Sequence, residues 1–224
     1  AMARTKKKKL ENPFVYQGYE SPTYFCDRTE ETENILSALR NGRNITLISP
    51  RKIGKTGLIN HAFYHIMAQE SDIICIYIDI FSTNNLQEFV ETISKAVIED
   101  ALNREKSFMM KVLDFFKGLR PTITPDLLTG MPTVSVNVVP VQAEYTLKSI
   151  FTHLENLNKR VYLAIDEFQQ IGEFEDSITV QKRLRGIWQH QQNVSYCLFG
   201  SKKHLMTELF QNRKMPFYQF VVLV

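Results

Sequence analysis

The stretch ITLISPRKIGKTG, residues 45–57, begins as an apolar run and breaks into a basic loop that contains a glycine. Its end, Gly54-Lys55-Thr56, fits the pattern of Gly, four residues, then Gly-Lys-Ser/Thr, and Ser49 stands where that pattern has its first Gly. A small residue and a Gly at positive φ let consecutive backbone N–H groups surround phosphate oxygens at a helix N-terminus. We interpret the stretch as a phosphate-binding loop, with a basic surface turn as the alternative.

The residues after the loop support this interpretation. Apolar side chains recur at helical spacing from Leu58 to Met67, so the loop lies between a strand and a helix, as phosphate-binding loops do. We expect Lys55 to reach the β- and γ-phosphates and Thr56 to place its hydroxyl on Mg²⁺. The predicted nucleotide-binding residues of the loop are Ser49, Pro50, Arg51, Lys52, Ile53, Gly54, Lys55, Thr56 and Gly57.

A second decisive stretch is VYLAIDE, residues 161–167, an apolar strand that ends in two adjacent carboxylates. An Asp at the carboxyl end of a parallel strand near the phosphates can support Mg²⁺, which assigns Asp166 to the metal. Glu167 can then polarise the attacking water. The alternative is an acidic strand end without a function.

The rest of the chain alternates strands and helices, which is typical of an α/β fold. The sequence predicts further strands at 73–80, 194–200 and 217–224, and helices at 27–42, 85–101, 147–157, 177–191 and 205–210. Residues 103–144 depart from this rhythm, with a short helix and a strand or hairpin arm, and we interpret them as an insertion. We expect residues 1–10 to be a disordered basic tail and residues 11–224 to form one nucleotide-binding domain.

Composition narrows the class of protein. The 224 residues are 44% apolar, enough for a large core, and carry a formal charge of +3. Five of the cations lie between Arg4 and Lys9, and the remainder has 22 Lys and Arg against 24 Asp and Glu, a charge of −2. The three distant cysteines indicate neither a disulfide framework nor a zinc site. No apolar run reaches the length of a membrane helix, so we expect a cytoplasmic protein without membrane contact.

These motifs together resemble the AAA-plus superfamily of P-loop ATPases. Four segments further resemble its STAND-related bacterial and archaeal ATPases: Asn12–Phe14, Phe25–Arg28, Ser49–Thr56 and Ile165–Gln169. The resemblance begins near residue 11 and covers nearly all of the chain. It implies a three-layer P-loop NTPase fold, with a five-stranded, mainly parallel sheet in the order 5-1-4-3-2 and helices on both faces.

The resemblance also implies roles for single residues. Glu167 corresponds to the catalytic carboxylate, and Ser201 to the sensor residue that orients the γ-phosphate or water. Arg213 corresponds to an arginine finger for a neighbour's nucleotide, with Arg183, Arg185 and Lys214 as competing candidates. Arg28 lies beside the region that covers the adenine. The C-terminal lid of these ATPases and their later domains are expected to be absent from this chain.

The sequence therefore predicts a core that binds ATP or ADP with Mg²⁺ and hydrolyses ATP, in a regulatory or DNA-linked process. The alternative is a nucleotide-gated switch that signals through assembly, with negligible hydrolysis. A homo-oligomer and nucleic acid, the latter through the basic tail, remain open as partners.

Overall fold

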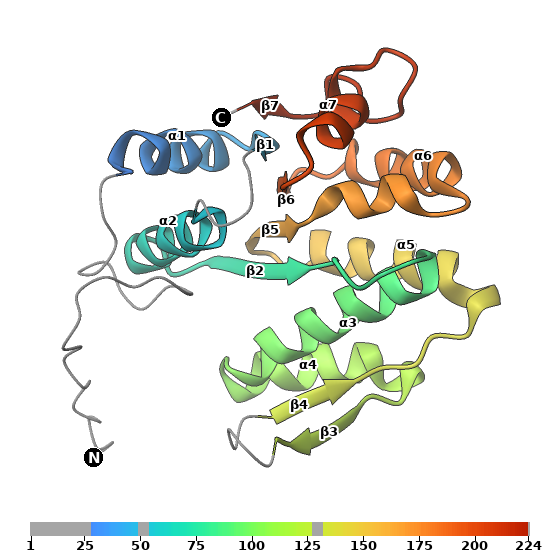
Figure 1. Cartoon of the computed structure of the whole chain (residues 1–224). Helices are drawn as coiled ribbons and strands as arrows, with labels where there is room; N and C mark the ends of the chain where they lie inside the picture. The colour runs from blue at the N-terminus through green and yellow to red at the C-terminus, as the bar shows by residue number, and fades with distance from the viewer. Residues whose placement is uncertain (1–27, 49–53, 127–131, 224) are drawn as a thin grey trace.

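The computed structural model describes residues 28–48, 54–126 and 132–223, and its centre is a parallel five-stranded sheet (Figure 1). Its strands are β1 (Ile45–Ile48), β2 (Ile73–Asp79), β5 (Arg160–Asp166), β6 (Val194–Gly200) and β7 (Val222–Leu223). They are arranged β7-β1-β6-β5-β2, which is the expected order 5-1-4-3-2 in the labels of Figure 1. The α/β fold class is therefore confirmed.

Helices cover both faces of this sheet (Figure 1). One face packs on α1 (Thr29–Arg40) and α2 (Lys55–Gln69), and the other on α3 (Leu86–Leu102), α5 (Ala143–Glu155), α6 (Ser177–Trp188) and α7 (Lys203–Gln211). The continuous apolar strands supply both cores because side chains alternate between faces. In β5, Val161, Leu163 and Ile165 join the larger core, whereas Tyr162 and Ala164 join the smaller one.

The segment that follows α3 forms a small layer of its own beside that helix (Figure 1). It contains α4 (Lys106–Phe116) and an antiparallel hairpin of β3 (Thr122–Pro125) and β4 (Pro132–Ser135). The carboxylate of Glu91 on α3 accepts a hydrogen bond from the backbone N–H of Val138 at 2.8 Å. Val134, Val136 and Val138 are buried against the larger core, which explains their alternation in the sequence.

Two predicted element boundaries and one predicted buried residue were wrong. Helix α1 begins at Thr29 after the N-cap Arg28, instead of after Asp27, which lies outside the described residues. Met67, expected on the buried face of α2, is 45% exposed. The expected strand at 217–224 is reduced to Val222–Leu223.

The shorter last strand has a packing reason. Phe217 and Phe220 turn into an aromatic cluster with Trp188, at ring-centroid distances of 5.6 and 6.0 Å. Tyr196 of β6 stacks on Trp188 at 4.1 Å and extends this cluster towards the sheet. Burial of these rings stabilises a turn where the sequence pattern alone favoured an extended strand.

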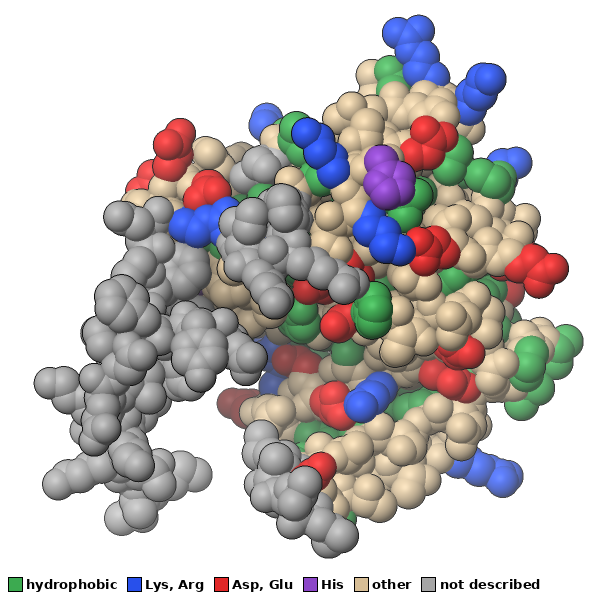
Figure 2. All heavy atoms as spheres, in the orientation of Figure 1, with side chains coloured by type: hydrophobic (Ala, Val, Ile, Leu, Met, Phe, Trp, Pro, Cys, Tyr) green, Lys and Arg blue, Asp and Glu red, His purple; other side chains and the backbone are tan. Residues whose placement is uncertain are grey.

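The face shown in Figure 2 carries Lys and Arg side chains interspersed with Asp and Glu. This distribution agrees with the small formal charge of the chain outside its N-terminal residues. Among the described residues, no helix combines the length and apolarity needed to cross a membrane.

Candidate active site

The N-terminus of α2 is the first part of the site. Gly54 is its N-cap residue, with φ of 71° and ψ of 24°, the left-handed conformation that glycine adopts without strain. Among the described residues, no side-chain hydrogen bond caps this terminus, and its first turn contains no acidic residue, so it is suited to an anion. Lys55 and Gly57, which follow, are both buried. The predicted residues Ser49, Pro50, Arg51, Lys52 and Ile53 lie outside the described residues.

Thr56 meets Asp166 at the carboxyl ends of the strands. The Thr56 hydroxyl donates to Oδ2 of Asp166 at 3.3 Å, across 110 positions of sequence. The Tyr77 hydroxyl, from the neighbouring strand β2, donates to the same oxygen at 2.7 Å. The other Asp166 oxygen accepts the backbone N–H of Glu167 at 2.7 Å. The structure therefore brings together the two residues that the sequence assigned to the metal.

The electrostatics of Asp166 favour a cation. Burial raises the pKa of the Asp166 carboxyl, and the nearby carboxylates of Glu167 and Asp79 raise it further, whereas hydrogen bonds from Tyr77 and the Glu167 backbone lower it. Asp79 lies level with Asp166 in the parallel register of β2 and β5. A divalent cation at this edge would neutralise part of that negative charge.

The residues present fit Mg²⁺ bound together with a nucleotide. No group of three or more His, Cys, Asp or Glu in the described ranges could hold a metal ion by itself. Mg²⁺ does not need such a cage, because it keeps several waters and uses one or two carboxylates together with substrate phosphates. The Thr56 hydroxyl and the Asp166 carboxylate, beside an anion-binding helix terminus, provide this kind of partial site.

Glu167 and Ser201 also meet, as the sequence assignments require. The Ser201 hydroxyl, just after β6, donates to Oε2 of Glu167 at 2.8 Å. Gln169 donates its side-chain amide to the same oxygen. Glu167 has φ of 54°, a left-handed conformation that is uncommon outside glycine, and it leads into the 3-10 helix η4 (Phe168–Glu173).

The two predicted arginines lie apart from this network. Arg28 forms an ion pair with Glu31 at 2.6 Å at the start of α1, and this hydrogen-bonded pair raises the pKa of its guanidinium. Arg213 is exposed on the segment between α7 and β7. The hydrogen bonds to Asp166 in the described part of the chain come from Thr56, Tyr77 and Glu167, so the assignments of Arg28 and Arg213 stay predictions.

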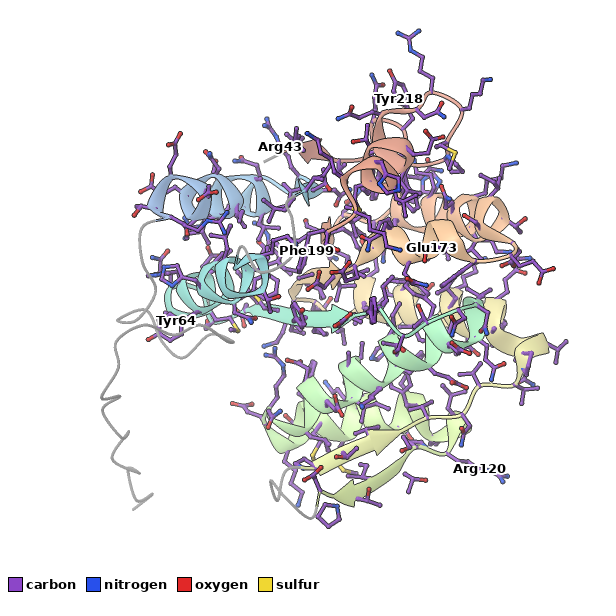
Figure 3. The ribbon with its side chains drawn as sticks, in the orientation of Figure 1. Arg43, Tyr64, Arg120, Glu173, Phe199 and Tyr218 are labelled. Carbon is purple, nitrogen blue, oxygen red and sulfur yellow. The ribbon has the colours of Figure 1, made fainter. Side chains whose placement is uncertain are left out.

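Sequence analysis missed two polar residues of the site. Tyr77 was hidden within an apolar strand, although it lies two positions before Asp79 and therefore on the same face. Gln169 follows the acidic pair at the third position after Asp166, but its burial depends on β6 and could not be read from local sequence. Figure 3 labels one residue from each of the two segments next to Gln169: the buried Phe199 of β6 and the exposed Glu173 at the end of η4.

Residues 25–215 match the family model of an ATPase domain predominantly from Archaea. The chain belongs to this family. The match supports the P-loop ATPase core that the sequence predicted, while the finer resemblance to STAND-related ATPases stays a prediction. No curated protein matches the chain in sequence.

Solved structures share the fold of this ATPase domain. A Walker-type ATPase of Pyrococcus abyssi is similar with a TM-score of 0.57 and 16% identity, over 95% of this chain and 57% of that one. The ORC2 protein of Aeropyrum pernix, in ADPNP–ADP complexes, is similar with a TM-score of 0.51 and 15% identity, over 89% of this chain and 47% of that one. A chain of Drosophila ORC bound to DNA is similar with a TM-score of 0.55 and 13% identity, over 100% of this chain and 51% of that one. The chain thus spans about half the length of these relatives' chains.

Proposed function

We propose that this ATPase domain binds ATP and Mg²⁺ and hydrolyses ATP. The observation that carries the proposal is the meeting of Thr56, Asp166, Glu167 and Ser201 at one edge of the sheet, beside the uncapped terminus of α2. Hydroxyl, carboxylate and backbone N–H groups at this edge are the groups that phosphoryl transfer requires for positioning and charge stabilisation.

Each residue has a separate task in the proposed reaction. Lys55 and the backbone of the loop bind the phosphates, and Thr56 and Asp166 hold Mg²⁺, which neutralises charge on the phosphate oxygens. Glu167 accepts a hydrogen bond from the attacking water and orients it. Ser201 orients the same water or the γ-phosphate, and Arg213 of a second copy would supply positive charge.

The first test is nucleotide binding by isothermal titration with ATP and Mg²⁺. Lys55→Ala should lose binding, because its side chain carries the charge that faces the phosphates, while Lys182→Ala, exposed on α6, should bind like the wild type. Circular dichroism and thermal melts check that the Lys55 variant remains folded, since Lys55 is buried. Equal binding by the wild type and a folded Lys55→Ala variant would contradict the proposal.

Hydrolysis is tested separately from binding. Glu167→Gln should keep ATP affinity and lose turnover, because the amide cannot polarise water as a carboxylate does. Glu175→Gln, an exposed carboxylate nearby in the chain, is the matched control and should keep turnover. Unchanged turnover in Glu167→Gln would remove Glu167 from the mechanism.

A second candidate function is a nucleotide-gated switch that signals through assembly with negligible hydrolysis. The exposed position of Arg213, on the segment before β7, favours it because this side chain is available to another copy. Light scattering with ADP and with ADPNP would then give different masses, and Arg213→Ala should remove the difference while Lys182→Ala, exposed on α6, keeps it. The same mass in both nucleotide states argues against the switch.

A DNA-linked process is part of the proposal, supported by the fold shared with Drosophila ORC bound to DNA and by the basic residues 4–9. The face shown in Figure 2 carries mixed charges, and the chain outside residues 4–9 has a formal charge of −2, which favours the N-terminal tract as the contact. DNA affinity should fall with salt and be lost when residues 1–10 are deleted. Salt-dependent binding that persists after the deletion would contradict this contact.

A further inference from the structure

Gln169 is the first long polar side chain after the acidic pair, and the proposed reaction assigns it no role. Gln169 is 0% exposed, and its Nε2 donates to Oε2 of Glu167. Its Oε1 is also buried and has no hydrogen-bond partner within the described part of the chain. Burial of an amide with one half unpaired is unfavourable, and an apolar side chain of the same length would avoid this cost. Stability alone therefore does not explain a glutamine at this position.

The backbone two residues before Gln169 has an uncommon conformation. Glu167 is left-handed, and such a conformation in a residue with a side chain persists only where its surroundings hold it. The Glu167 carbonyl accepts the N–H of Gln170 at 2.9 Å, which fixes the start of η4. The side chain of Gln169 donates to the Glu167 carboxylate. Two residues of η4 therefore hold Glu167: Gln170 binds its backbone carbonyl, and Gln169 binds its side chain.

Gly200 provides the space for this arrangement. A Cβ atom added at Gly200 would overlap Oε1 of Gln169 and approach its Cδ to 3.1 Å. Ser201 directly follows Gly200, the last residue of β6, and its hydroxyl donates to the carboxylate of Glu167. Lys202 then pairs with Glu173 of η4 at 2.5 Å, a further link between the same two segments. The end of β6 and η4 are thus joined around the Glu167 carboxylate.

The direction of the carboxylate follows from the sheet order. β6 lies between β5 and β1, and β1 leads into the phosphate-binding loop. Ser201, at the end of β6, therefore lies on the side of Glu167 that faces β1. In the proposed ATPase, a carboxylate held against Ser201 would be directed towards the nucleotide.

We infer that Gln169 is a positioning residue that holds the Glu167 carboxylate against Ser201, in the orientation needed to activate water. The inference rests on the proposed ATPase function for its effect on turnover, whereas the hydrogen bonds from Gln169 and Ser201 to Glu167 are features of the structure itself. Gln169 touches neither nucleotide nor water in this role and acts only through Glu167.

The kinetic test uses Gln169→Met, which keeps the length and loses the donor, and Gln170→Met as the matched control on the same helix. Gln169→Met should lower kcat at least about tenfold and change nucleotide Kd less than about threefold, because positioning of one oxygen affects turnover and not phosphate binding. Gln170→Met should change neither. In a Glu167→Gln background, Gln169→Met should cause no further loss.

A second measurement does not require turnover. The side-chain NH₂ resonances of Gln169, assigned by their loss in a ¹⁵N spectrum of Gln169→Met, should shift in Glu167→Gln, because the charged acceptor becomes neutral. Unchanged resonances overturn the inference, as does an unchanged or raised kcat in Gln169→Met, or an equal loss on the Glu167→Gln background. If the wild type binds ATP without hydrolysing it, the ATPase proposal fails, and the resonance shift alone decides whether Gln169 holds Glu167.

Discussion

Alanine in place of Gly200 would force a Cβ atom into the Oε1 atom of Gln169 and to 2.9 Å from Sδ of Met206. Both contacts are closer than real Cβ atoms show, and Gln169 and Met206 are themselves fully buried. Overpacking of this kind costs about 1–3 kcal/mol. For a chain of this size each kcal/mol corresponds to about 2–4 °C, so Gly200→Ala should lower Tm by about 2–12 °C.

The matched control for this substitution is Gly186→Ala. Gly186 is exposed within α6, and a Cβ there meets nothing within 4 Å. Alanine favours a helix interior over glycine by about 1 kcal/mol, so this variant should melt at or above the wild-type temperature. Differential scanning calorimetry of the three proteins measures the difference. A Gly200→Ala variant that melts with the wild type would refute the packing of Gln169 against β6.

Three further substitutions test the site and its surroundings. Tyr77→Phe should cost about 1–3 kcal/mol in urea unfolding, since Asp166 loses a hydrogen bond, whereas Tyr64→Phe on the exposed face of α2 should cost nothing measurable. Asp166→Asn should raise Tm without ligand, because burial raises the pKa of this carboxyl and the amide avoids the cost of charge, and it should abolish the Tm gain from Mg²⁺ and ATP. Burial lowers the pKa of His153, so the unfolded state takes up more protons below about pH 6.5 and stability falls there; His153→Phe should lose less between pH 7.5 and 5.5, by urea unfolding at each pH.

The sequence predicted the strands that were both long and apolar, and their ends located part of the site. Parallel strands carry their carboxyl ends to one edge of the sheet, so a polar residue after 165 and another after 200 had to lie near each other. Thr56, Asp166, Glu167 and Ser201 could be anticipated for this reason. The residues joined by the hydrogen bonds Thr56–Asp166 and Glu167–Ser201 are 110 and 34 positions apart, and only the assembled sheet brings them together.

Other features depend on partners that local sequence does not contain. Phe217 and Phe220 belong to an apolar run that resembles a strand, but Trp188, about 30 positions earlier, draws both rings into a cluster. Gln169 is buried because Gly200 leaves space for its amide. A glycine at the end of an apolar run gives no sign of which side chain will occupy that space.

Three unfavourable features of the described chain meet just after β5, and a comparison with Asp100 shows why this matters. Burial also raises the pKa of Asp100, but Arg104, just after α3, pairs with that carboxylate at 2.5 Å, so the buried Asp100 has a cationic partner. Within the described ranges Asp166 has only hydroxyl and backbone N–H donors, Glu167 next to it is left-handed, and Gln169 has an unpaired buried oxygen. Strain and buried negative charge that coincide at one edge of a well-packed sheet are the expected signature of a functional site. A cation coordinated by Asp166 would offset the negative charge of Asp166, Glu167 and Asp79, and nucleotide phosphates would complete its coordination. Nucleotide with Mg²⁺ should therefore stabilise this protein more than either alone.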